Sequence, residues 1–417
     1  MNNMQFGKKL LSYLKLQKVR KISIFLLISF VVLFLFGFTE FNEDNLYSYQ
    51  WGLKNNGNFF VNRNFLRENH KPSYFDKSVN DLMFFDNKYV LNYQATLGAL
   101  GDSIVSKDLF DIDWEKGYSL FQNEGYKRDV VIALIDTGVD ITHYELTDSI
   151  WVNQGEIPNN LIDDDRNGYI DDVWGYNFHD KNGNVFVESL SEVHGTHAAG
   201  IMVANHANTG IKGLAHDSHV KLMVLKVLDS NENGYMSSVI EAINYARNNG
   251  AKICNISLGA YTYDKNIDNV IKNYQDMLFV VSAGNGMDFI GYSLDERDVY
   301  PAKLTYDNVI TVSNAAFDGT RYESANFGSY VDIFAPGTFI LSTVPGNGFA
   351  YLTGTSMASP FVTATCAMIY SRYPKVPLNQ YKNLIINGAT KESALFGLSK
   401  SAGLLNVYNT LYIASTY

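Results

Sequence analysis

Seven residues near the end of the chain, Gly354-Thr355-Ser356-Met357-Ala358-Ser359-Pro360, are the most informative stretch of the sequence. Ser356 stands among small residues just before an apolar run from Phe361 to Tyr370, which predicts a loop that leads into a buried helix. A serine at such a helix start has an accessible hydroxyl and a backbone N–H directed at a bound anion. Because an ordinary helix N-terminus has the same features, two upstream segments decide the interpretation.

The first upstream segment is a predicted strand that ends in a carboxylate. Val130 to Ile135 form an uninterrupted apolar run, which is typical of a parallel strand covered on both faces. Asp136, followed by Thr137 and Gly138, then lies at the carboxyl edge of the sheet, where ligand crevices open. A turn or helix-capping role is the alternative for this aspartate.

The second segment is a predicted helix that begins with a histidine. The stretch from His194 to Gly200, His-Gly-Thr-His-Ala-Ala-Gly, has small residues that allow tight packing and places His194 at the N-terminal end. There the imidazole can face both a carboxylate and a hydroxyl. A metal site with His197 is disfavoured, because no Cys, Asp or Glu stands at ligand spacing on the helix.

Asp136, His194 and Ser356 therefore form a set of orienting carboxylate, base and nucleophile, in the chain order of the subtilisin template. Two further blocks lie between His194 and Ser356, namely Asn255-Ile256-Ser257-Leu258-Gly259 and Ser282-Ala283-Gly284-Asn285-Gly286. With all five blocks in this order, the chain resembles the subtilisin-like serine proteases, the subtilase family. The resemblance covers roughly two stretches, residues 44–57 and 110–417.

The resemblance implies a fold, an activity and a role for each block. It implies a three-layer subtilisin-like α/β fold and a serine endopeptidase that needs no catalytic cofactor and acts on peptides or proteins. Asp136, His194 and Ser356 would form the catalytic triad, and Asn285 would donate to the oxyanion. The substrate backbone would pair with Ser257, Leu258 and Gly259.

The order of elements predicts the same fold class independently. Strands and helices alternate after Asp136, which favours a mostly parallel central sheet with helices on both faces. The expected strands are 221–228, 251–258, 277–282, 309–312 and 331–334, and the expected helices are 236–249 and 267–274, with a last helix that starts within 403–408.

The composition limits the partners and the redox chemistry. A formal net charge of −10 argues against nucleic acids and anionic surfaces as partners of the folded part. Only two cysteines occur, Cys254 and Cys366, and both lie in apolar segments, so we expect no disulfide framework. We expect the catalytic domain to be monomeric.

The N-terminus has a different character from the rest of the chain. Six cationic residues precede an apolar stretch of 17 residues, Ile22–Phe38. This pattern predicts a cytoplasmic basic tail followed by a transmembrane signal-anchor or a signal peptide over residues 1–39. Residues 40–417 would then be an extracellular catalytic domain at the cell membrane, or a secreted one if the segment is cleaved. Within this domain, residues 58–109 are an unassigned insertion, expected to pack on the rest.

An acidic loop predicts a structural calcium site. Five aspartates lie within residues 163–172, and Gly168 permits a sharp turn after three alternating oxygen ligands. The expected ligands are Asp163, Asp165, Asn167, the carbonyl of Tyr169, and Asp171 or Asp172. Trp174 stands where an EF-hand would have its terminal Glu, so the loop is no EF-hand. A solvated acidic turn is the alternative.

The sequence leaves two questions open, namely the side-chain preference of the substrate pocket and the choice between a protease and a binding protein. Val299–Ala302 resembles the base of the family's substrate pocket, and the preceding Asp295, Glu296 and Asp298 suggest either a preference for basic residues or a solvated loop. The runner-up function is a catalytically silent peptide-binding pseudoprotease. An esterase of the α/β-hydrolase type is excluded, because that class needs G-x-S-x-G and the order Ser, acid, His.

Overall fold

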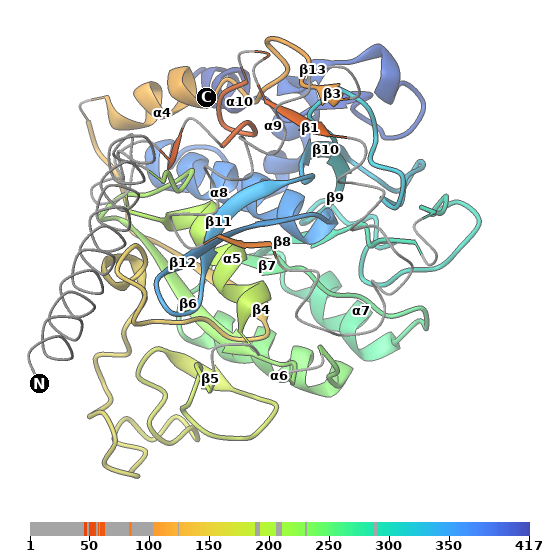
Figure 1. Ribbon diagram of the computed structural model, residues 1–417. Coiled ribbons are helices and arrows are strands. Elements are labelled where there is room, and N and C mark those ends of the chain that lie inside the picture. Colours follow the sequence, from red (N-terminus) through yellow and green to blue (C-terminus); the bar gives the residue numbers. More distant parts are fainter. Residues whose placement is uncertain are drawn as a thin grey trace, which may run out of the picture. The chain divides into compact units, whose positions relative to one another are not determined.

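A nine-stranded sheet organises the part of the chain that this computed structural model describes (Figure 1). The described residues are 46–47, 50–55, 57, 59–62, 83–85, 103–123, 125–187, 192–205, 211–229, 232–286 and 290–417. The strand order is β13-β14-β10-β9-β8-β7-β4-β6-β5, and every neighbouring pair is parallel except β13 with β14. The strands are β4 (Val130–Asp136), β5 (Gly175–Asn177), β6 (Val220–Lys226), β7 (Ile253–Ile256), β8 (Leu278–Ser282), β9 (Val309–Ala315), β10 (Ile333–Pro336), β13 (Thr390–Lys391) and β14 (Gly403–Leu404).

Helices cover both faces of this sheet. The α-helices of the described part are α4 (Trp114–Gln122), α5 (Val193–Val203), α6 (Met236–Asn248), α7 (Lys265–Asn273), α8 (Thr355–Arg372), α9 (Tyr381–Gly388) and α10 (Val407–Ala414), with short 3-10 helices at Thr147–Ser149, Leu378–Gln380 and Ser393–Leu395. α8 packs on the central strands and against α5. α6 and α7 pack on the opposite face of the sheet. There Ala133 and Ile135 of β4 belong to one hydrophobic cluster with Val239 and Ala242 of α6. The predicted α/β fold with helices on both faces is confirmed.

The apolar run of β4 explains why this strand is central. Successive side chains point to opposite faces, so Ala133 and Ile135 face α6 while Ile132 and Leu134 face the other layer. All four are fully buried. The predicted strands and helices correspond to β6–β10, α6 and α7. The predicted last helix is α10, which starts at Val407 within the expected range, and Gly403–Leu404 before it form β14.

Three short strands come from the insertion at residues 58–109. β1 (Phe60–Asn62) pairs antiparallel with β3 (Ser103–Val105). β2 (Met83–Phe85) pairs antiparallel with β12 (Gly348–Leu352), which forms a hairpin with β11 (Ile340–Val344). This part of the insertion therefore extends the hairpin that leads into α8.

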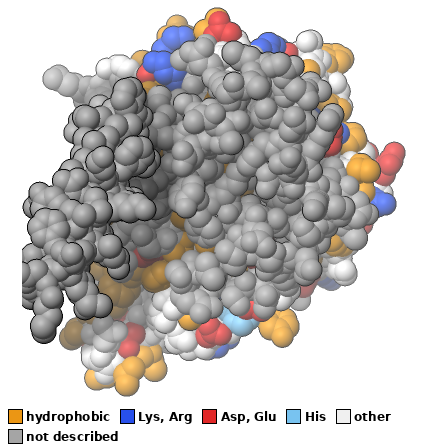
Figure 2. Space-filling model, in the orientation of Figure 1, with side chains coloured by type: hydrophobic (Ala, Val, Ile, Leu, Met, Phe, Trp, Pro, Cys, Tyr) orange, Lys and Arg blue, Asp and Glu red, His pale blue; other side chains and the backbone are white. Residues whose placement is uncertain are grey.

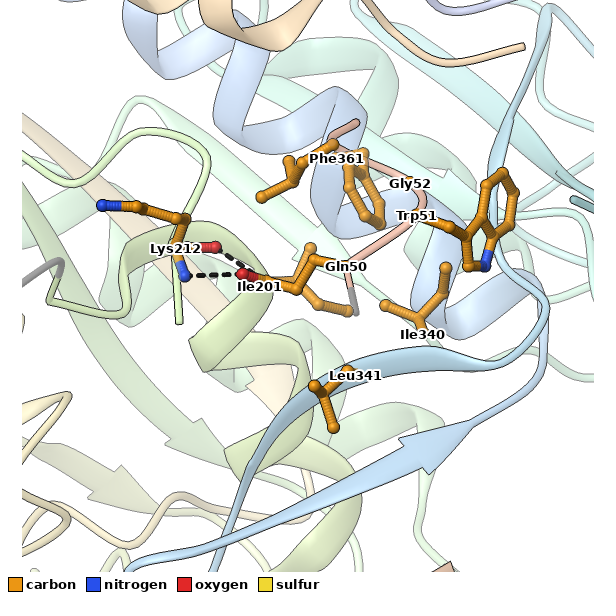
Figure 3. A pocket seen from close by; sticks show the side chains of 9 residues that line it. Gln50, Trp51, Gly52, Ile201, Lys212, Ile340, Leu341 and Phe361 are labelled. Carbon is orange, nitrogen blue, oxygen red and sulfur yellow. Dashed lines mark hydrogen bonds between the residues drawn. The ribbon is translucent and has the colours of Figure 1, made fainter. Parts of the chain in front are cut away.

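The segment Gln50–Leu53 lines a small cavity beside Phe361 of α8, and Figure 3 shows Gln50, Trp51 and Gly52 around it. The Gln50 side chain exchanges two hydrogen bonds with the Lys212 backbone, donating to its carbonyl at 3.0 Å and accepting from its N–H at 2.7 Å. The indole N–H of Trp51 donates to the Thr338 carbonyl at 2.8 Å. The cavity between these groups and Phe361 holds only ≈ 10 Å³, too little for a peptide side chain.

None of the helices within the described ranges has both the length and the apolar character needed to span a membrane. The predicted span Ile22–Phe38 lies outside those ranges, as does the predicted boundary between residues 39 and 40.

Candidate active site

A buried aspartate and a histidine meet at the carboxyl edge of the sheet. Asp136 is the last residue of β4 and is only 1% exposed. Its Oδ1 lies 2.7 Å from Nδ1 of His194, in the first turn of α5, and also accepts the Thr137 N–H at 2.7 Å. A carboxylate that holds Nδ1–H fixes the tautomer, so Nε2 is the nitrogen that can accept a proton.

The electrostatics of this pair favour a charged imidazole. Burial disfavours the imidazolium, but the adjacent Asp136 carboxylate outweighs that effect and raises the pKa of His194 to about 9. A histidine so stabilised in its charged form is a strong proton acceptor when neutral.

Ser356 lies in the first turn of α8, which packs against α5. Its hydroxyl donates to the carbonyl oxygen of Ser257 at 3.2 Å and its side chain is partly exposed. Ser257 follows directly after β7, a neighbour of β4 in the sheet. The fold therefore brings the serine to the edge of the sheet at which Asp136 ends.

A pocket of ≈ 180 Å³ lies beside Ser356. Its lining comprises Ser257, Leu258, Gly259, Ala260, Tyr261, Ser282, Gly284, Asn285, Val299, Asn326, Thr355 and Ser356. It thus unites the predicted nucleophile, the predicted oxyanion donor and the three residues predicted to bind substrate. Of these lining residues none is charged, so the pocket is suited to neutral side chains.

The Asn285 side chain is oriented by the start of α8. Its Oδ1 accepts the backbone N–H of Thr355 at 3.1 Å. Its Nδ2 approaches Gly354 closely, since a Cβ at that glycine would lie 3.3 Å away. With Oδ1 engaged, the amide N–H groups remain to donate, as a site for a developing oxyanion requires.

The acidic residues before Val299 point to other partners. Asp295 accepts the Ser329 N–H at 2.9 Å, and Asp298 pairs with Lys303 at 2.8 Å. Glu296 is exposed and is likewise not one of the pocket residues. The suggested preference for basic residues therefore finds no support here, and the solvated-loop interpretation describes the segment better.

Asn326 and Ser282 also line the pocket, although no sequence pattern predicts them as site residues. Asn326 is buried, and its side chain donates to the Ala283 carbonyl at 2.9 Å and accepts the Tyr292 N–H at 2.8 Å. These two hydrogen bonds fix the position of the segment that carries Asn285. Only the folded arrangement reveals this role, because the loop of Asn326 is distant in sequence.

The acidic loop holds three carboxylates close together, but only two are predicted ligands. Oxygens of Glu156, Asp165 and Asp172 lie within 4.8 Å of one another, the one such group among the residues described. Burial raises the pKa of both Glu156 and Asp172. Figure 2 shows acidic and hydrophobic side chains along the lower edge of the molecule, where Figure 1 places the loop before β5.

Two predicted ligands have other partners in this loop. The Asp163 carboxylate accepts the N–H groups of Asn167 and Gly168 at 3.0 and 2.9 Å. The Asp171 carboxylate accepts those of Asn160 and Leu161, both at 3.0 Å. These two aspartates thus shape the turns of the loop.

Asn167 does lie at the cluster, since its side-chain amide donates to Asp165 at 3.1 Å and to Asp172 at 2.9 Å. The Tyr169 ring packs edge-on against Tyr245, whose hydroxyl also donates to Asp172. Glu156 was missed because it lies upstream of the alternating Asp-Asp-Asn pattern.

Comparisons with known proteins find relatives that match well over half of this chain. The model of the subtilase family matches residues 127–404. Subtilisin DY of Bacillus licheniformis is 31% identical over 289 residues, 69% of this chain and 92% of that protein. Subtilisin-like protease 1 of Plasmodium vivax is 32% identical over 303 residues, 68% of this chain but 47% of that protein. The match thus spans about half or less of the Plasmodium relatives' length. A crystal structure of a cold adapted subtilisin-like serine proteinase shares the fold, with a TM-score of 0.54 and 24% identity over 68% of this chain and 91% of that one.

Proposed function

Because the chain belongs to the subtilase family of serine proteases, we propose that it is an endopeptidase that cleaves peptide bonds through an acyl-enzyme intermediate. Ser356 is the proposed nucleophile, His194 the general base and Asp136 its orienting partner. The observation that carries this proposal is the pocket that unites Ser356 and Asn285 with residues 257–259. The 2.7 Å contact between Asp136 and His194 supports it, because His194 lies on α5, which packs against the helix of Ser356.

In the proposed reaction, the Ser356 hydroxyl turns from the Ser257 carbonyl toward the imidazole and attacks the substrate carbonyl carbon. Its proton passes to Nε2 of His194, and the oxyanion accepts hydrogen bonds from the Asn285 side chain and the Ser356 backbone N–H. The C–N bond then breaks, and the leaving amine takes the proton from His194. A water molecule, activated by the same imidazole, hydrolyses the acyl ester.

The substrate would bind as an extended strand along residues 257–259. Main-chain hydrogen bonds of this kind give affinity with little sequence selectivity, and side-chain pockets supply the selectivity. The uncharged pocket of ≈ 180 Å³ favours neutral substrate side chains at the position that enters it.

A cleavage assay on an unfolded protein substrate tests this function. We expect the wild type to produce defined fragments and Ser356→Ala to produce none above background. Ser371→Ala is the matched control, since it removes a hydroxyl at the other end of α8, where it donates to the Arg128 carbonyl. If Ser356→Ala cleaves as fast as the wild type, the proposed nucleophile is wrong. If the wild type binds peptides but never cleaves them, the pseudoprotease alternative holds.

We also propose that the acidic loop binds a structural calcium ion through Glu156, Asp165 and Asp172, with the Asn167 side chain re-oriented to offer its oxygen. Three carboxylates within 4.8 Å repel one another, two of them partly or fully buried, and a hard dication relieves that repulsion. The ion would support the loop and take no part in the reaction.

For the location of the protein, the proposal of an N-terminal anchor rests on the sequence alone, on the cationic residues before Ile22–Phe38. Protease shaving of intact cells that carry the full chain tests it. Degradation of a membrane-bound form from outside is the expected result, whereas a soluble extracellular form indicates a cleaved signal. Recovery only from the cytosol contradicts both.

A further inference from the structure

A buried ion pair lies directly behind the proposed catalytic dyad. Lys226, the last residue of β6, places Nζ 3.0 Å from Oε1 of Glu192, and their side chains are 3% and 0% exposed. The same ammonium donates to the carbonyl oxygens of Thr137 and Leu228, the latter at 2.9 Å. The ammonium therefore has two backbone carbonyls as hydrogen-bond acceptors and a carboxylate oxygen at ion-pair distance.

One side of the pair holds the turn that follows Asp136. Lys226 is in register with Asp136 in the parallel pair β4–β6. Its ammonium fixes the carbonyl of Thr137, whose own N–H donates to Oδ1 of Asp136 at 2.7 Å. The orientation of the Asp136 carboxylate therefore depends on Thr137, a residue whose carbonyl Lys226 restrains.

The other side of the pair holds the start of the helix that carries His194. Glu192 is the residue before α5, two positions ahead of His194, and its carbonyl accepts the Thr196 N–H at 2.9 Å. The hydroxyl of Thr137 accepts the Gly195 N–H at 3.1 Å, so the turn and the helix also meet directly.

The side chains of Lys226 and Glu192 pack tightly against the turn that contains Gly138. A Cβ at Gly138 would lie 2.8 Å from Cγ of Glu192 and 3.2 Å from Cδ of Lys226. Two residues with long charged side chains are thus held in one geometry, between the strand end of Asp136 and the helix start of His194.

We propose that the Lys226–Glu192 ion pair is a positioning device that sets the contact between Asp136 and His194, and thereby the turnover of the enzyme. Packing alone does not call for this arrangement, because apolar residues of similar volume fill a buried site at least as favourably as an ion pair. An ion pair whose ammonium also donates two hydrogen bonds to backbone carbonyls restrains the backbone in position and angle, as a catalytic contact requires. The inference rests on the proposed function, since it assigns a supporting role to two residues that touch no substrate.

The test compares Glu192→Gln and the doubly neutral Lys226→Met/Glu192→Gln with the wild type, by measuring kcat, KM and the pH profile of kcat/KM. We expect kcat to fall at least tenfold with KM changed less than twofold, and the midpoint of the pH profile to move down as the Asp136–His194 contact loosens. Arg247→Met/Asp276→Asn, which removes a surface pair with a 3.0 Å contact, is the control and should leave all three unchanged.

A purely structural role would lower the melting temperature and leave kcat per folded molecule and the pH midpoint at the wild-type values. That result overturns the proposal, as does a failure of both variants to fold, which would assign the pair to fold stability. Failure of the proposed function would be distinguishable, because it would show as full activity of Ser356→Ala in the same assay.

Discussion

Ser257 and Ser356 exchange two hydrogen bonds between the strand end after β7 and the start of α8. The Ser356 hydroxyl donates to the carbonyl of Ser257 at 3.2 Å, and the Ser257 hydroxyl donates to the carbonyl of Ser356 at 3.3 Å. The second bond has a reason in the sequence, because residue 360 is a proline and has no N–H to donate to the carbonyl four residues earlier. Ser257 supplies the missing donor and ties the substrate-binding segment to the proposed nucleophile.

Ser257→Ala should therefore destabilise the fold by about 1–3 kcal/mol, the cost of leaving a partly buried carbonyl without a partner. Pro360→Ala in the same chain restores a helical N–H for that carbonyl and should recover part of the loss. Urea unfolding of the two single variants and the double variant measures this coupling. If the effects of the two substitutions simply add, the carbonyl of Ser356 does not depend on Ser257.

Replacing Asn285 should lower kcat and leave KM nearly unchanged, because an oxyanion donor acts in the transition state. For Asn285→Ala we expect a loss of about 10²–10³ in kcat, which is the magnitude established for such a donor in subtilisin itself. Asn285→Asp retains the acceptor for the Thr355 N–H but removes the donor, so it should be at least as impaired. Steady-state kinetics of both variants measure this effect. A loss of kcat below about threefold in Asn285→Asp would show that the side chain does not stabilise the oxyanion and only shapes the pocket.

The pH profile should report the Asp136–His194 contact. His194 must be neutral to accept a proton, and the Asp136 carboxylate raises its pKa to about 9, against the opposing effect of burial. We therefore expect kcat/KM to rise with pH through a midpoint near 9. Asp136→Asn should lower kcat by about 10⁴, since the tautomer is no longer fixed, and should move the midpoint of the residual activity down. An unmoved midpoint would show that the aspartate does not set the charge of the histidine.

Calcium should raise the melting temperature, and more so at neutral than at acid pH. The pKa values of Glu156 and Asp172 are raised by burial in the folded state, so without a cation stability falls as pH rises through those values. Calcium needs the deprotonated carboxylates and stabilises the fold by about 2.7 kcal/mol at a hundredfold excess over Kd.

Thermal unfolding with calcium and with chelator, for the wild type and Asp165→Asn, checks this expectation. The variant should lose most of the calcium effect, whereas the surface control Asp276→Asn should keep it. Equal melting curves of the wild type in calcium and in chelator would exclude a stabilising ion at this loop.

Local patterns predict the sheet and the site blocks because each block is nearly continuous in sequence. The apolar run before Asp136 requires burial on both faces, and that requirement alone places the strand in the middle of a parallel sheet. The blocks around His194, Asn285 and Ser356 then lie at the ends of such elements, and the connections of a parallel sheet bring them to one edge.

Contacts between distant charged residues escape such reasoning. Lys226 and Glu192 are residue types that normally lie at the surface, so no sequence pattern marks them as a buried pair behind the dyad. In the acidic loop, the alternation of oxygens does not decide between binding an ion and accepting backbone N–H groups. Asp163 does the latter, and only the loop conformation shows it.

The most direct test of the central claim is covalent labelling with an activated fluorophosphonate, which forms a P–O bond to a nucleophilic serine as fluoride leaves. Mass spectrometry of the wild type should show one adduct per chain, mapped to Ser356 and formed in parallel with loss of peptide cleavage. Ser356→Ala should remain unlabelled and inactive. An adduct at another serine, or labelling and cleavage by Ser356→Ala at the wild-type rate, would contradict the assignment of Ser356 as the nucleophile.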